Sequence, residues 1–224
     1  MDKLQAYEFV ALICPGAFTI YGLSKIFPQA ATIFSDDKLS FGEFGLLLVL
    51  AFVAGHLVQS LGNLIEKAYW SLWGGKPTDW LRTGKHDVIS PKQKARIPPT
   101  IKRLLNIDCP EDFKLSRKDW SSLTSQIYAA VRKSGQAARI DVFVGAYDLL
   151  RGIAASVVLL AVTAVLVKGQ ANLPGGISFY GLSLVLLVLA LYRMHRFGFH
   201  YANELFVQFL TIELEIKDKP EIAD

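Results

Sequence analysis

The chain has 224 residues, of which 52% are hydrophobic and only 20% carry a charged side chain. Soluble globular domains contain about 45–50% apolar and about 25% charged residues, and the mean hydropathy of this chain is +0.32. This hydrophobicity excludes a disordered chain, and a count of only two cysteines excludes a disulfide-stabilised secreted scaffold. The apolar residues lie in four separate blocks, which predicts an all-α membrane protein with four transmembrane helices.

The first apolar block, residues 7–27, carries charged residues only near its ends. At about 1.5 Å per residue, a helix of this length crosses a hydrocarbon core of roughly 30 Å. A cleaved signal peptide is the alternative interpretation, although no A-x-A cleavage site follows the block. Pro15 and Gly16 are expected to kink this helix, which neighbouring helices can accommodate within a bundle.

The other three blocks comprise residues 41–65, 149–167 and 177–192. The second contains Ala51 and Gly55, a pair of small residues at a spacing that lets another helix approach closely. The third carries Arg151 near its start, where the long side chain can reach the membrane interface. The fourth has only 16 residues, so it spans a membrane only if Phe197 and Phe199 extend it.

Basic residues predict the orientation of these blocks. Of the 24 lysines and arginines, 16 lie between Lys67 and Arg151, whereas only Lys25, Lys38 and Lys168 lie toward the opposite side. The positive-inside rule therefore places both termini and the central loop in the cytoplasm. The chain is therefore expected to cross a membrane several times.

These features divide the chain into four parts. They are a first transmembrane hairpin (1–66), a basic, mainly helical cytoplasmic region (67–148), a second transmembrane hairpin (149–192) and a cytoplasmic amphipathic tail (193–224). The central loop has 16 basic and eight acidic residues, a net charge of +8, whereas the tail has four basic and six acidic residues, a net charge of −2. The tail is therefore expected to dock on the loop, and binding of the loop to anionic lipid headgroups is the alternative.

The cytoplasmic region contains signals for starting and for stopping helices. Ser116 and Asp119 form a capping-box variant, which predicts the start of a helix. Thr78 or Asp79 is expected to cap a shorter helix earlier in the region. Residues 83–99 are expected to contain no long element, because they include four helix breakers: Gly84, Pro91, Pro98 and Pro99.

Three polar residues lie in the second predicted span. His56 is the titratable side chain deep in this span, and Gln59 and Asn63 follow it at steps of three and four residues. Polar groups are unfavourable in hydrocarbon and usually face a bundle interior or a water-filled path. These residues are therefore expected to form a polar seam, which either lines a pore or provides interhelical hydrogen bonds worth about 1 kcal/mol or less each.

Two groups of charged residues and one aromatic group are further candidates for binding. A basic cytoplasmic surface is expected from Lys102, Arg103, Arg117, Lys118, Arg132 and Lys133. A cluster at the membrane boundary is expected from Asp148, Arg151, Arg193, Arg196 and His200, with the first two paired through their spacing of three residues. Tyr69, Trp70 and Trp73 are expected to anchor the second span at the membrane interface, and an aromatic ligand cage is the alternative.

Arg193 and His200 are separated by six residues, which matches the loose Arg–His pattern of HEPN-type ribonucleases, although both residue types are also expected as anchors at a membrane boundary. No metal, cofactor or other catalytic site is predicted. Cys14 and Cys109 do not have zinc-ligand spacing, and phosphate-binding, nucleophile-elbow and zinc-protease motifs do not occur in the sequence. Cys109 is expected to be a reduced thiol, with no disulfide in the protein and no enzyme activity.

Residues 52–66, followed by Lys76-Pro77-Thr78-Asp79-Trp80, resemble a pattern of small bacterial four-span inner-membrane proteins. The beginning of the chain, Tyr7-Glu8-Phe9-Val10 with Pro15-Gly16, resembles the same group. The similarity is best over the first 80 residues, and the group has no established activity. Some similar proteins accompany antiphage defence systems, where they oligomerise and damage or depolarise the inner membrane.

Together, these features predict an oligomeric inner-membrane effector or pore whose cytoplasmic loop and tail receive a signal from a cytosolic protein or a small anionic ligand. A non-conducting membrane anchor that recruits a cytosolic partner is the main alternative, and a membrane-tethered HEPN-like ribonuclease is a weaker one. The expected partners are the lipid bilayer, further copies of the chain and a cytosolic protein. Binding of nucleic acid or of a nucleotide is a further alternative.

Overall fold

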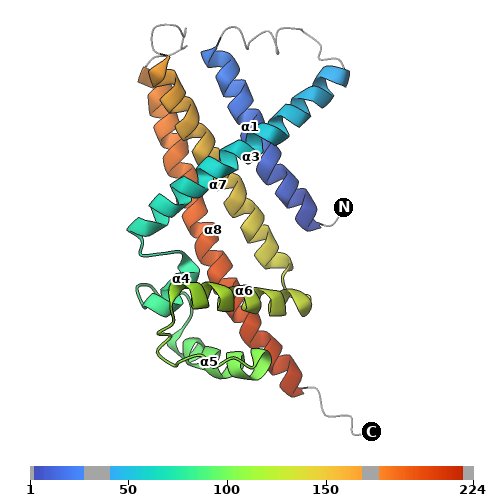
Figure 1. The fold of residues 1–224 in the computed structure, drawn as a ribbon, viewed down its shortest axis with the longest axis vertical. Coiled ribbons are helices and arrows are strands. Elements are labelled where there is room, and N and C mark those ends of the chain that lie inside the picture. The colour runs from blue at the N-terminus through green and yellow to red at the C-terminus, as the bar shows by residue number, and fades with distance from the viewer. Residues whose placement is uncertain (1–2, 28–40, 168–176, 219–224) are drawn as a thin grey trace. The chain divides into compact units, whose positions relative to one another are not determined.

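The computed structural model describes residues 3–27, 41–167 and 177–218. Residues 28–40 and 168–176, which include Lys38 and Lys168, lie outside this description. The elements are α1 (Lys3–Ile26), α3 (Phe41–Leu72), α4 (Pro77–Thr83), α5 (Pro91–Leu105), α6 (Arg117–Lys133), α7 (Ala138–Leu166) and α8 (Ile177–Asp218) (Figure 1). No strand occurs among the described residues, and the predicted all-α fold class is confirmed.

Four of these helices, α1, α3, α7 and α8, are long and apolar enough to cross a membrane. The protein is thus a multi-pass membrane protein, as its four apolar blocks predict. Helix α7 has 29 residues and α8 has 42, so both exceed the roughly 20 residues that a span requires. The third block therefore continues an amphipathic helix that precedes it, and the fourth continues through Phe197 and Phe199 into the tail.

The described residues belong to two compact units. The membrane unit comprises residues 1–68 and 145–196, and the loop–tail unit comprises residues 69–144 and 197–224. Helices α3, α7 and α8 each contribute residues to both units, because the boundaries fall within them. The central loop and the tail thus fold together, as their opposite net charges predict.

Small residues allow α1 and α3 to cross closely in the membrane unit (Figure 1). A Cβ atom added to Gly16 would lie 2.7 Å from the Gly55 nitrogen and would also overlap the Ala51 carbonyl group. One added to Gly55 would overlap the backbone of Leu12. The predicted pair of small residues on α3 therefore packs against a glycine of α1, as close helix crossings in membranes require.

Pro15 lies inside α1 and removes one helical hydrogen bond, because proline has no N–H to donate to the carbonyl of Ala11. The Gln59 Nε2 atom of α3 donates to this carbonyl instead, at 2.9 Å. The Pro15 carbonyl accepts a hydrogen bond of 3.1 Å from Ser156 Oγ of α7. Neighbouring helices thus compensate for the proline in the way that apolar surroundings demand.

The structure corrects the expectation that prolines prevent a long element in residues 83–99. Helix α5 begins at Pro91 and continues through Pro98 and Pro99. Pro91 occupies the first turn, where its missing N–H has no consequence, and the preceding Ser90 side chain accepts a hydrogen bond from the Gln93 N–H, in a reciprocal capping box.

Tertiary packing explains why α5 tolerates its two internal prolines. Ile97 and Ile101 lie one helical turn apart and are both completely buried, so the helix gains apolar burial on either side of Pro98. Thr100 Oγ1 also donates to the Arg96 carbonyl at 2.7 Å. Burial of this face outweighs the low helix propensity of proline.

The caps of the neighbouring helices are a mixture of expected and unexpected residues. Ser116 caps α6 by accepting from the Asp119 N–H at 3.1 Å, which confirms the predicted start of that helix. Lys76, and neither Thr78 nor Asp79, occupies the N-cap position of α4, but its side chain makes no capping hydrogen bond; Pro77 follows in the first turn. Asp79 instead accepts from the Lys76 N–H at 3.2 Å.

The core of the loop–tail unit surrounds Trp120 of α6. Its ring lies 6.3 Å from that of Phe206 in the tail and 5.9 Å from that of Phe113 in the loop, measured between centroids. Its Nε1 atom donates to the Thr78 carbonyl at 3.0 Å. The tail residue Asn203 also donates to the Val88 carbonyl at 2.6 Å, so both apolar and polar contacts fix the tail on the loop.

Candidate functional site: a polar cluster in the membrane unit

Arg151 of α7 is the centre of a polar cluster in the membrane unit. Its Nε donates to Gln59 Oε1 at 3.1 Å, its Nη1 to Glu66 Oε2 at 2.7 Å, and its Nη2 pairs with Asp148 Oδ1 at 3.0 Å. The predicted pairing of Asp148 with Arg151 is confirmed. All three nitrogens of the guanidinium group thus bind side chains within the same unit.

Helix geometry brings these residues together. Gln59 and Glu66 are seven residues apart on α3, so they share one face of that helix, and Asp148 and Arg151 are neighbours on α7. Gly62 lies between the two α3 residues, and a Cβ atom there would lie only 3.1 Å from Arg151 Cγ. The glycine therefore makes room for the arginine side chain between the two helices.

The cluster is mostly removed from solvent. The exposed fractions of the side chains are 5% for Glu66, 17% for Arg151 and 33% for Asp148. Ionised groups in such surroundings are tolerated only when they are paired and hydrogen-bonded. With one positive and two negative formal charges, the cluster can hold α3 and α7 together.

Gln59 links three helices of the membrane unit. Its amide nitrogen donates both to the Ala11 carbonyl of α1 and to the Asp148 carbonyl of α7, each at 2.9 Å. Its oxygen accepts from Arg151. Both hydrogens of the amide nitrogen are thus used, and the residue is part of the internal packing of the unit.

The structure separates the three residues of the predicted polar seam. Gln59 faces the interior of the membrane unit, whereas His56 and Asn63 are exposed. The His56 ring contacts Phe52 of its own helix, with 4.6 Å between centroids. Glu66, which was not among the predicted site residues, binds Arg151 together with Gln59. Its seven-residue distance from Gln59 on the same helix is the signal that could have identified it.

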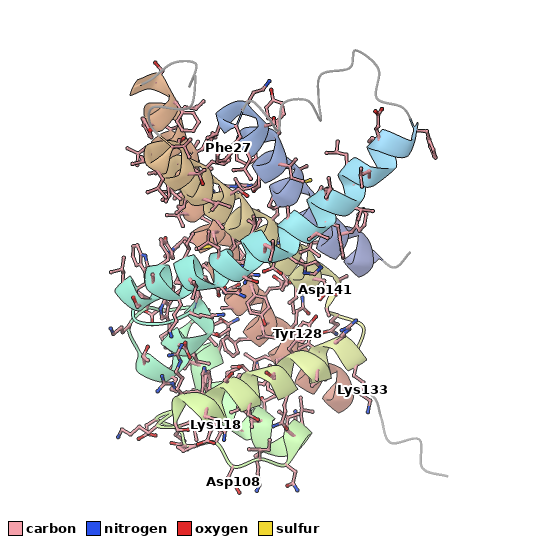
Figure 2. All side chains as sticks on the ribbon, turned by 45° about the horizontal axis from the view of Figure 1, so that its top comes forward. Phe27, Asp108, Lys118, Tyr128, Lys133 and Asp141 are labelled. Carbon is pink, nitrogen blue, oxygen red and sulfur yellow. The ribbon has the colours of Figure 1, made fainter. Side chains whose placement is uncertain are left out.

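The six residues of the predicted basic surface are exposed in the loop–tail unit, but they do not form one patch. Two lie at the end of α5, where Lys102 pairs with Asp108 at 2.7 Å. The other four are divided between the first and last turns of α6, and Figure 2 shows Lys118 and Lys133 near opposite ends of this helix. The cations in the last turn complement the partial negative charge of the helix end.

The remaining residues of the predicted boundary cluster are distributed over both units. Arg193 and Arg196 are exposed residues of the membrane unit, whereas His200 belongs to the loop–tail unit. The His200 ring is stacked on Phe143, with 5.6 Å between centroids, and contacts Phe199 edge-on. This histidine is part of an aromatic cluster.

The aromatic residues after the second span have different environments. Trp70 and Trp80 are buried and contact each other edge-on, and Trp80 Nε1 donates to the Trp73 carbonyl at 3.1 Å. The exposed His86 ring lies 4.5 Å from the Trp80 ring. Only Trp73 of the three tryptophans is exposed, so it is the one available as an interfacial anchor.

Tyr128 and Cys109 are among the titratable groups of the loop–tail unit whose pKa values are shifted. Tyr128 Oη donates to Asp141 Oδ1 at 2.6 Å, and the labelled side chains lie next to each other in Figure 2. Burial and this bond to a carboxylate raise the pKa of Tyr128 to about 12. Burial also raises the pKa of the Cys109 thiol, which favours its protonated, unreactive form.

Among the described residues, no group of three or more His, Cys, Asp or Glu side chains is placed to hold a metal ion. Comparisons of the chain with protein-family models, with curated proteins and with solved structures found no match. The proposed function therefore depends on the sequence and on the geometry of the two units.

Proposed function

We propose that this protein is an oligomeric effector or pore of the bacterial inner membrane, with both termini in the cytoplasm. In this proposal, the loop–tail unit receives a signal from a cytosolic protein or a small anionic ligand. The observation that supports it best is that the loop and the tail fold into one compact unit in a chain that also has four membrane-spanning helices. The resemblance to proteins that accompany antiphage defence suggests phage infection as the trigger.

The positive charge of the loop, which is one of the two segments of the loop–tail unit, supports an anionic or acidic partner. Residues 69–144 contain 14 basic and seven acidic residues, and the basic side chains at both ends of α6 are exposed. Cations on a protein surface attract anionic partners and accelerate their association. The first turn of α6, with Arg117 and Lys118, is therefore a suitable place to test recognition.

A non-conducting membrane anchor is the second candidate function, and the Arg151 cluster favours it. Arg151, Gln59, Glu66 and Asp148 bind one another or the helix backbone. Polar groups used in this way stabilise the packing of helices and do not line a path for ions. An anchor would recruit the same partner through the loop–tail unit without changing the membrane potential.

A membrane-potential dye assay distinguishes the two candidates. Cells would express the full chain alone and together with the proteins encoded beside it. An effector is expected to depolarise the membrane when its partner is present, and Arg117→Glu with Lys118→Glu is expected to abolish this response. Ser122→Glu with Gln126→Glu is the matched control, since it adds two negative charges to exposed positions of the same helix without removing the cations.

The outcomes have distinct meanings. Unchanged membrane potential in every condition, combined with recovery of the partner on the purified chain, would refute the effector and support the anchor. Depolarisation that is equally strong in the Arg117 and Lys118 variant would remove the α6 cations from the signal-receiving surface.

A further inference from the structure

One face of α3 in the membrane unit carries exposed polar side chains. His56, Ser60 and Asn63 follow one another at steps of four and three residues, so they share one face of the helix, and all three are exposed. They lie within residues 44–65, a stretch without Asp, Glu, Lys or Arg. These three residues, the outward stripe, therefore lie in the apolar part of the span.

The hydrogen-bonding groups of the outward stripe are mostly unused. Within the part of the chain that the structure describes, neither the His56 imidazole nor the Asn63 amide makes a hydrogen bond. Ser60 Oγ donates to the His56 carbonyl of its own helix at 3.0 Å. Lipid chains offer neither donors nor acceptors, so polar groups that face them are unfavourable. The outward stripe thus offers hydrogen-bonding groups to a polar partner beyond the described residues of the membrane unit.

Two glycines continue this face toward the beginning of α3. Gly42, Gly45, Val49 and His56 follow one another along α3 at steps of three, four and seven residues. These steps place all four residues on one side of the helix. A Cβ atom added to either glycine would meet no other atom within 4 Å. The glycines at the crossing of α1 and α3 have no such space. Glycine on an open helix surface lets a second helix approach closely in a membrane.

We infer that the outward stripe binds the outward stripe of a second copy of this chain. The inference rests on the proposed function and deepens it by naming the surface through which the copies assemble. All copies insert into the membrane with the same orientation, so two α3 helices related by a twofold axis along the membrane normal run parallel. Each residue near the axis then meets the same residue of the second copy.

The chemistry of the outward stripe suits such self-pairing. A neutral imidazole and a primary amide each contain a donor and an acceptor, so His56 and Asn63 can each bond to their own counterpart. The exposed side chains of Val49 and Val53 supply apolar contact beside them. Lys67, the next residue on this face, lies beyond the uncharged stretch, so the contact ends before like charges meet.

Cysteine cross-linking in native membranes tests this contact. The full chain with Cys14→Ser and Cys109→Ser would carry a single new cysteine, either Ser60→Cys on the outward stripe or Leu184→Cys on α8. Leu184 is 63% exposed in the membrane unit, so it is a matched control for random collision. A disulfide-linked dimer is expected for Ser60→Cys, with little for Leu184→Cys.

Two further variants connect the cross-link to the polar and small residues. Combining His56→Leu with Asn63→Leu is expected to weaken association about tenfold, because two interhelical hydrogen bonds of ordinary strength are lost. Gly45→Leu is expected to abolish the Ser60→Cys cross-link by blocking close approach. Because a Cβ atom at Gly45 meets nothing within 4 Å, this second variant is expected to leave the fold of the single chain intact, and its thermal unfolding should match that of wild type.

Each outcome separates this inference from the proposed function. If wild type depolarises the membrane while Ser60→Cys cross-links no more than Leu184→Cys, the outward stripe is not the contact and the effector stands. If Ser60→Cys forms the dimer and Gly45→Leu prevents it, the contact between the two α3 helices is supported. If wild type at the same time leaves the membrane potential unchanged in every condition, the effector function is refuted. If Ser60→Cys instead cross-links to a protein of a different size, the outward stripe binds another protein, and the inference of a second copy is refuted.

Discussion

Both units have buried apolar side chains, but the membrane unit also buries charged groups and exposes large apolar ones. The interior of the membrane unit contains a charged cluster around Arg151, and large apolar side chains such as Leu57 and Leu184 are exposed on its surface. The loop–tail unit buries Trp120 and Phe206 and exposes its charges. The difference follows from the solvent, because lipid gives no advantage to burying apolar groups, whereas water does.

The same comparison explains which interactions specify each unit. In the membrane unit, close contacts of glycines and hydrogen bonds between helices select the arrangement, since apolar side chains pack equally well against lipid. In the loop–tail unit, burial of aromatic side chains provides the stabilisation and the caps of α5 and α6 define where helices begin. Substitutions in the two units should therefore have effects of different origin.

The largest expected effect is loss of the aromatic core in the loop–tail unit. Trp120→Ala removes a side chain that is 1% exposed, together with its hydrogen bond to Thr78. A cavity of this kind costs about 3–5 kcal/mol. Hydrogen exchange of the detergent-solubilised chain should show faster exchange in α4, α5 and α6 and unchanged exchange around Gln59 of α3. Equal acceleration in both units would contradict the expectation that the effect is confined to the loop–tail unit.

A comparable effect in the membrane unit is expected from Arg151→Leu, which leaves two carboxylates without their cation. Breaking a buried ion pair from one side costs about 3–5 kcal/mol. Thermal unfolding of the protein in lipid nanodiscs should detect this loss. Combining Arg151→Leu with Glu66→Leu should restore much of the stability, since the most buried carboxylate is then absent. A double variant as unstable as Arg151→Leu would show that the pairing with Glu66 is not the cause.

A smaller effect is expected from Gln59→Leu, which has nearly the same volume but leaves the Ala11 carbonyl without its donor. A buried acceptor that loses its partner costs about 1–3 kcal/mol. Because Pro15 created this requirement, Pro15→Ala should reduce the penalty of Gln59→Leu in a double-mutant cycle, measured by the same unfolding assay. Additive effects of the two substitutions would rule out the coupling.

The smallest effect is a loss of stability at alkaline pH that arises from Tyr128 of the loop–tail unit. Its pKa is about 12 in the folded protein against the ordinary value of 10.0. Between these two values, the unfolded chain releases the proton and the folded chain keeps it, so the stabilisation present below pH 10 is lost as the pH rises to about 12. Difference absorbance of phenolate between wild type and Tyr128→Phe would measure this titration, and Asp141→Asn should lower the pKa of Tyr128. An unchanged titration in Asp141→Asn would exclude the carboxylate as a cause.

Four long apolar helices and the start of α6 after Ser116 follow from the sequence alone, and the opposite net charges of loop and tail indicate their association as one of two interpretations. Each depends on local composition, on the spacing of a few residues or on net charge, which are properties of the chain before it folds. The pairing of Asp148 with Arg151 belongs to the same group, because three residues along a helix always bring side chains together.

Contacts with other helices decide which polar residues of α3 face inward. His56, Gln59 and Asn63 lie within about 60° of one another on the helix, so their spacing cannot separate the one that meets Arg151 from the two that face outward. The passage of α5 through Pro98 and Pro99 is decided in the same way, by burial of Ile97 and Ile101. In both cases the deciding free energy comes from contacts with residues far away in the sequence. Local helix propensity and hydrophobic periodicity carry no information about such contacts.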